Sequence, residues 1–135
     1  MRKVEELKRA ARREDWDLVD REIAAIVDEP IYYKWAFLAG TGDLDGNVRD
    51  LAVSIIERSD IPEKEFAAMR MPLYQLMLED DNRYVGFRAA FALANHGPGP
   101  YKERVIEKLN EALRDKDVES IARGYLNKLR TKLKS

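Results

Sequence analysis

The segment Asp43-Leu44-Asp45-Gly46-Asn47-Val48 has a second version 37 residues later, Asp80-Asp81-Asn82-Arg83-Tyr84-Val85. In both versions an acidic residue stands five positions before the valine, and a residue of the helix-capping type, Asp45 or Asn82, stands three positions before it. The apolar residues that follow the two valines also correspond, in the pairs Ala52 and Ala89, Ile55 and Ala92, and Ile56 and Leu93. Because these residues are spaced three and four positions apart, each version predicts a helix that buries one face.

The same apolar spacing occurs twice more along the chain. A third copy begins 33 residues after Val85 and contains Val118, Ala122, Tyr125 and Leu126. A looser first copy contains Val19, Ile23, Ile26 and Val27. Self-similarity at this period, with room for two helices in each unit, predicts an α-solenoid in which each helix pair buries its apolar face against its neighbours.

Stop signals divide the chain into eight predicted helices and no strand. The residue before Pro30 is pushed out of the helical region, Gly40-Thr41-Gly42 ends the next helix, and the Gly-Pro repeats at 96–100 break the chain again. Pro72 falls inside one predicted helix and should kink it. The predicted helices cover about residues 2–13, 15–28, 30–39, 45–58, 62–78, 82–95, 100–114 and 117–133. We therefore expect an all-α fold, with the helices in about four pairs, in a single domain over residues 1–135.

The pattern Asp43-x-Asp45-x-x-Val48-Arg49-x-x-Ala52-x-x-Ile55-Ile56 resembles the second-helix signature of HEAT repeats. It is most similar to the short HEAT-like repeats that also occur in phycobilin lyases. The second copy departs from the family at Gly86, where arginine is usual, and the third copy has Glu119 there. The resemblance implies a solenoid of HEAT-like helix pairs in which the second helix of each pair lines the concave surface.

The composition excludes several kinds of site. The chain has no cysteine and a single histidine, His96, so disulfides, thiolate nucleophiles, cysteine-ligated metals and multi-histidine metal sites are excluded. No apolar run is long enough to span a bilayer, and no apolar leader follows Met1. We expect a cytoplasmic protein without cofactor or metal, and the high charge with a single glutamine is a surface style associated with thermophiles.

The charges are segregated along the chain. Residues 1–13 carry a net charge of +4, residues 14–81 carry −11, and residues 82–135 carry +6. A basic C-terminal face could bind nucleic acid or an acidic protein. Its basic residues include Arg123, Lys128, Arg130, Lys132 and Lys134. The acidic middle of the chain would repel a polyanion, which disfavours nucleic acid.

The predicted helix over residues 82–95 is apolar nearly all round. Its Phe87 and Phe91 are four positions apart, so they lie side by side. They form either an exposed aromatic patch that receives a partner or part of the core, with Arg88 reaching a nearby acid. The candidate contact residues on the three second helices are Arg49, Val53, Phe87, Arg88, Phe91 and Arg123.

These observations predict a protein-binding scaffold or adaptor that is a monomer or a weak homodimer. The alternatives are a nucleic-acid-binding protein and an enzyme of unknown type. Helix capping accounts for the paired acids, such as those at positions 80 and 81, so no catalytic residues are assigned. Asp43 to Asn47 does not match a calcium-binding loop, because the glycine and glutamate that such a loop needs are replaced by Val48 and Ser54.

Overall fold

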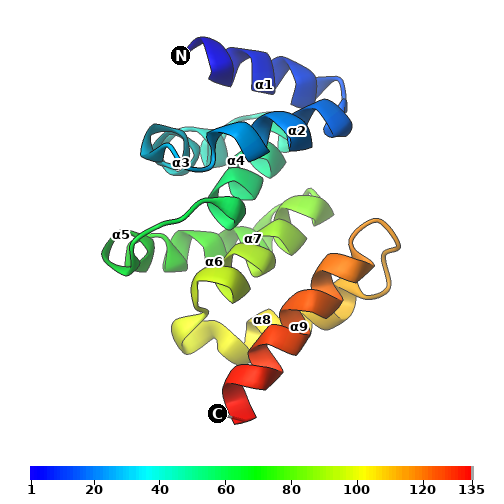
Figure 1. The fold of residues 1–135 in the computed structure, drawn as a ribbon. Helices are drawn as coiled ribbons and strands as arrows, with labels where there is room; N and C mark the ends of the chain where they lie inside the picture. Colours follow the sequence, from blue (N-terminus) through cyan, green and yellow to red (C-terminus); the bar gives the residue numbers. More distant parts are fainter. Residues whose placement is uncertain (135) are drawn as a thin grey trace. The chain divides into compact units, whose positions relative to one another are not determined.

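The computed structural model describes residues 1–134, and the side chains of residues 1–131 (Figure 1). Within this range every regular element is a helix, which confirms the expected all-α class. The backbone forms two compact units, Met1–Pro62 and a second that begins at Glu63. None of the described helices combines the length and the hydropathy needed to cross a bilayer.

The first unit is organised around one helix, α4. In chain order the unit contains α1 (Arg2–Arg12), α2 (Trp16–Ile26), α3 (Pro30–Leu38), the 3₁₀ turn η1 (Gly40–Gly42) and α4 (Gly46–Arg58). Helix α4 packs against α1, α3 and η1, and α1 packs against α2. The apolar residues that the repeat alignment assigns to the core of α4 are all fully buried, namely Val48, Ala52, Ile55 and Ile56.

The second unit is organised around α7 in the same way. It contains α5 (Glu63–Ala67), α6 (Arg70–Glu79), α7 (Arg83–His96), the 3₁₀ turn η2 (Gly99–Tyr101), α8 (Lys102–Ala112) and α9 (Glu119–Lys134). Helix α7 packs against α6, α8 and α9, and α8 packs against α9. The aligned residues of α7, namely Val85, Ala89, Ala92 and Leu93, are fully buried. In the third copy Val118, Ala122 and Leu126 are buried, whereas Tyr125 is half-exposed.

The loops before the repeated helices share one local geometry. In each loop an aspartate Oδ1 accepts a hydrogen bond from the backbone N–H two residues later. The three bonds run from Asp45 to Asp43 (2.9 Å), from Asn82 to Asp80 (2.9 Å) and from Asp117 to Asp115 (3.0 Å). The capping residues then accept from the first turns, Asp45 from the N–H groups of Asn47 and Val48, and Asn82 from that of Tyr84. The sequence repeat is therefore matched by the same hydrogen bond before α4, α7 and α9.

The structure corrects the helix expected over residues 62–78. It is two helices, α5 and α6, so the described residues contain nine α-helices rather than eight. Pro72 lies in the first turn of α6, and the interruption at 68–69 falls where proline cannot donate a hydrogen bond to the carbonyl of residue 68, so the expected kink is instead a break between two helices. The guanidinium of Arg70, at the start of α6, donates to the carbonyl oxygen of Gly97 (2.8 Å) and lies 2.7 Å from a carboxylate oxygen of Glu63. These contacts hold the two short helices and the end of α7 together.

Gly40 sits where two elements of the first unit approach closely. A Cβ atom at this position would lie 2.6 Å from the Cβ of Ala52 and 3.0 Å from the ring of Trp35. We expect Gly40→Ala to lower the free energy of unfolding by about 1–3 kcal/mol, because overpacking forces neighbouring atoms to move. Urea unfolding followed by circular dichroism measures the change. Gly42→Ala is the control, because a Cβ there meets nothing within 4 Å, and an equal loss in both variants would contradict the argument.

Candidate partner-binding surface

The aromatic pair of α7 belongs to the core. Phe91 is fully buried and its ring stacks on that of Tyr125, with 5.6 Å between the centroids. Phe87 is only 7% exposed, and the Lys108 Nζ lies 5.6 Å from its ring centroid. Of the two alternatives for this pair, the core is therefore correct and the exposed patch is wrong, because α6, α8 and α9 pack against the helix that carries both rings.

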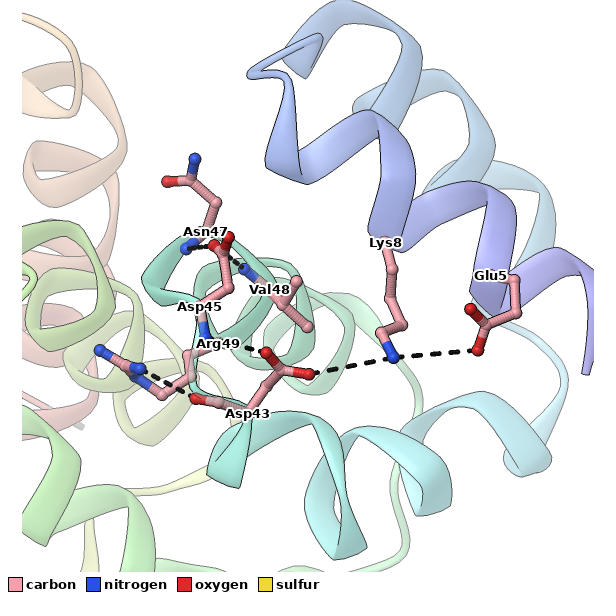
Figure 2. Close-up of polar contacts among 7 residues, drawn as sticks. All are labelled: Glu5, Lys8, Asp43, Asp45, Asn47, Val48 and Arg49. Atoms are coloured by element: carbon pink, nitrogen blue, oxygen red, sulfur yellow. Dashed lines mark hydrogen bonds and ion pairs between the residues drawn. The ribbon is translucent and has the colours of Figure 1, made fainter.

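Neither candidate residue of α4 is fully exposed. Val53 is fully buried, which corrects its assignment as a contact residue. Arg49 is half-buried, and its Nη1 donates to the carbonyl oxygen of Asp43 (2.9 Å; Figure 2) and to that of Leu44 (3.1 Å). The carboxylate of Asp43 lies 3.9 Å from the Lys8 Nζ of α1. Arg49 thus holds the loop that precedes its own helix.

The remaining two candidates lie on different surfaces of the second unit. Arg88 is half-buried, and its guanidinium carbon lies 5.9 Å from the centroid of the Phe91 ring. Arg123 is exposed on α9 and forms an ion pair with Glu119 at 3.4 Å. Since Arg123 and Tyr125 are two residues apart, they project about 200° apart around the helix. Tyr125 faces α7, so Arg123 faces away from it. Of the six candidates, only Arg123 is fully on the surface.

The surface of α9 carries a shallow hollow of about 230 Å³, which we call the α9 groove. It is lined by five residues of the helix: Ser120, Ile121, Gly124, Tyr125 and Lys128. Ile121, Tyr125 and Lys128 form a ridge along it with the spacing i, i+4, i+7, and the exposed small residues Ser120 and Gly124 lie beside this ridge. Arg123, Asn127 and Arg130 have the same spacing, but they project from the other side of the helix, about 160° around its axis, and do not line the groove.

Two side chains of the ridge, Tyr125 and Lys128, are fixed by contacts with α7. Tyr125 stacks on the buried ring of Phe91. The Lys128 Nζ donates to both the carbonyl oxygen (3.1 Å) and the Oδ1 (2.7 Å) of Asn95 on α7. Fixed side chains lose less conformational entropy when they are covered, so this wall is already organised for contact.

Gly124 has no role within the chain that explains its presence in a helix. It lies inside α9, its φ is not positive, and a Cβ there would meet nothing within 4 Å. Glycine inside a helix costs roughly 0.5–1 kcal/mol relative to alanine. Gly124 therefore lowers the stability of α9 at a position where the lining of the α9 groove has no side chain.

The described part of α9 is basic. Its cationic side chains are Arg123, Lys128 and Arg130, and Glu119 is its acidic residue. The side chains of Lys132 and Lys134, also expected on the basic face, lie outside the described residues. Lys128 lines the α9 groove, whereas Arg123 and Arg130 project from the other side of the helix.

Elsewhere the charged groups make surface contacts. The hydrogen bond from Lys3 to Glu22 lowers the pKa of that carboxyl and raises the pKa of the lysine. The hydrogen bond from Arg70 lowers the pKa of Glu63. Among the described residues no group of three or more acidic or histidine side chains is arranged to hold a metal ion.

Two further helices expose apolar side chains at a spacing of two turns. On α3, Ile31 is 53% and Leu38 is 81% exposed, and on α6, Met71 is 60% and Leu78 is 52% exposed. Leu44, in the loop before α4, is 99% exposed. Sequence reasoning missed these residues, because an apolar residue at helical spacing is indistinguishable from a core residue until its neighbours are known.

Comparisons with protein-family models, with curated proteins and with solved structures find no match to this chain. What the chain does must therefore be argued from its own surfaces.

The burial of Phe91 predicts a large loss of stability on truncation. We expect Phe91→Ala to lower the free energy of unfolding by about 3–5 kcal/mol, because it leaves a cavity beneath Tyr125. The exposed Arg123→Ala should change it by less than about 0.5 kcal/mol. Chemical denaturation of both variants measures the difference, and a change below about 1 kcal/mol for Phe91→Ala would show that the ring is not in the core.

The open space around Gly124 predicts the opposite effect. Gly124→Ala should raise the free energy of unfolding by roughly 0.5–1 kcal/mol, because alanine has the higher helix propensity and meets no neighbour. Thermal unfolding compared with the wild-type chain measures it. A destabilised variant would mean that an internal contact requires the glycine.

Proposed function

We propose that this chain is a protein-binding module of the HEAT-like type, a scaffold or adaptor, whose α9 groove binds a helix of a partner protein. The observation that carries the proposal is Gly124, a glycine that weakens α9 and that no contact with the described residues requires. A side chain at this position would occupy the α9 groove beside Tyr125 and Lys128. Glycine keeps the groove open for the backbone of another helix.

The geometry of the α9 groove suits a helix better than an extended peptide. Side chains at i, i+4 and i+7 form the ridges that pack into the grooves of a second helix, with the two axes about 8–10 Å apart. A small residue beside the ridge, such as Gly124, lets the axes approach to the short end of this range. An extended peptide would need unpaired backbone groups, as at a sheet edge, and an α-helix offers none along its side.

The exposed apolar side chains of α3 and α6 support the same class of function. Pairs such as Ile31 with Leu38 and Met71 with Leu78 gain free energy when a protein surface covers them. These apolar side chains have no charge or hydrogen-bond donor with which to bind the phosphates of a nucleic acid. The three cations in the described part of α9, Arg123, Lys128 and Arg130, are the specific observation that favours nucleic acid as a second candidate.

Capture of partners by the full-length chain tests the proposal. Tagged wild-type protein and Gly124→Gln are incubated with extracts of the source cells, and the bound proteins are compared by quantitative mass spectrometry. We expect Gly124→Gln to lose specific partners about tenfold, because the new side chain occupies the groove while the helix stays folded. Gly42→Gln, at an exposed glycine of the first unit with open space around it, is the matched control and should capture as the wild type does. Equal capture by the wild type and Gly124→Gln would refute the α9 groove as the binding surface.

A further inference from the structure

Helix α6 carries apolar side chains on two opposite sides. Leu73 and Met77 are buried on the side that packs against α7. On the other side Met71 is 60% and Leu78 is 52% exposed. Because these two residues are seven positions apart, they lie in line along the helix, two turns from each other. The outer side of α6 is therefore apolar at both of its ends.

Two uncharged polar side chains lie between the exposed apolar residues. Gln75 is exposed and Tyr74 is half-exposed, in the turn that separates Met71 from Leu78. We call these four residues, spaced i, i+3, i+4 and i+7, the α6 face. Positions 71–78 contain no charged residue, although 36% of the chain is charged, and Gln75 is its single glutamine. A surface without charge gains most from a cover that is itself uncharged, since a charge placed there would lose its water.

We infer that the α6 face binds the same face of a second copy of this chain, in an antiparallel pair of helices about a two-fold axis. The axis passes between Tyr74 and Gln75, so Met71 of each copy lies opposite Leu78 of the other. The Gln75 amide then lies opposite the Tyr74 hydroxyl, and each of these groups both donates and accepts hydrogen bonds. Apolar groups thus cover apolar groups, and polar groups pair with polar groups. No residue of the α9 groove takes part in this contact.

The α6 face is already fixed in the single chain. The ring of Tyr74 stacks on that of Tyr101, with 4.1 Å between the centroids and 11° between the planes. At the start of the helix the Arg70 guanidinium donates to the carbonyl oxygen of Gly97 (2.8 Å) and lies 2.7 Å from a carboxylate oxygen of Glu63. A surface that does not have to reorganise loses less conformational entropy when it is covered.

The exposed side of α3 has the same apolar spacing but not the same self-complementarity. Its Ile31 and Leu38 are also seven positions apart, but the two residues between them at the i+3 and i+4 positions are Lys34 and Trp35. An antiparallel pair of α3 helices would bring Lys34 of both copies together at the axis, where like charges repel. A second copy is therefore a suitable cover for α6 and an unsuitable one for α3.

Sedimentation of the full-length chain tests for the dimer. Helix α6 has only ten residues, so the contact is smaller than the roughly 800 Å² per partner of a standard interface, and the dimer is weak. We expect the average mass to rise from 15.6 kDa towards twice that value as the concentration approaches about 1 mM.

Lysine substitutions locate the contact. Leu78→Lys should raise the dissociation constant about tenfold or more, because the contact would then bury a cation from each copy. Leu44→Lys is the matched control, since it replaces another exposed leucine, in the first unit, and should dimerise as the wild type does. Circular dichroism should show the same helix content in all three proteins. A wild-type chain that stays monomeric throughout, or an equal loss in both variants, would overturn the inference.

Introduced cysteines test the register, because the chain has no cysteine of its own. Met71→Cys and Leu78→Cys are mixed at high concentration under mild oxidation, and the disulfide-linked dimers are identified by mass. We expect the mixed dimer to form at least about tenfold faster than either variant links to itself, since position 71 lies opposite 78 and about 10.5 Å along the axis from 71 of the other copy. Equal rates for the three pairings contradict the antiparallel contact.

Each other occupant gives a different result. A monomeric chain that retains a cellular protein, and loses it in Leu78→Lys, assigns the α6 face to that protein and overturns the inference. A dimer that persists in Leu78→Lys but dissociates in Leu38→Lys or in Gly124→Gln lies on α3 or at the α9 groove, and this also overturns it. Capture through the α9 groove is measured separately with Gly124→Gln, so the failure of the dimer leaves the proposed function standing.

Discussion

A carboxylate that accepts the backbone N–H two residues ahead recurs at three loops, and the register of the helices depends on it. Asp43, Asp80 and Asp115 each make this bond, at 2.9, 2.9 and 3.0 Å. The first turn of a helix has backbone donors without helical partners, so a fixed acceptor determines where the helix can begin. Once α4 and α7 begin at these points, their apolar residues fall on the buried side. The interaction is local, and for that reason its pattern is already visible in the sequence.

The number of neighbours around each repeated helix decides where a binding surface can exist. Helix α7 has three packed neighbours in its own unit, so nearly every side chain on it is buried, including Phe87 and Phe91. Helix α9 packs against α7 and α8 on one side, and its opposite face is exposed. Equivalent positions in the repeat therefore differ in burial. Phe87 and Phe91 of α7 stabilise the fold, whereas α9 presents exposed side chains such as Arg123 and Arg130.

Gly40 and Gly124 differ in the space that surrounds them. Gly40 is required by its surroundings, because a Cβ atom there would overlap Ala52. Gly124 is not required by anything within the chain, and it lowers the stability of the helix that contains it. The sequence separates the two by position, since Gly40 lies in the stop signal Gly40-Thr41-Gly42 and Gly124 lies inside the helix expected over residues 117–133, but only the packed neighbours show which of them a side chain would overlap.

The sequence by itself determined the all-helical class, the starts of the repeated helices and the buried residues Val48, Ala52, Val85 and Ala89, because capping and apolar periodicity are properties of neighbouring residues. Tertiary structure alone decided the rest. The helix expected over residues 62–78 divides at 68–69, four residues before Pro72, and the contact of Arg70 with the distant Gly97 that fixes the second piece is one that no local pattern contains. The burial of Phe91 under Tyr125 and the outward position of Arg123 likewise depend on which helices pack around α7 and α9. Periodicity assigns side chains to faces, but only the packed neighbours determine which faces are covered.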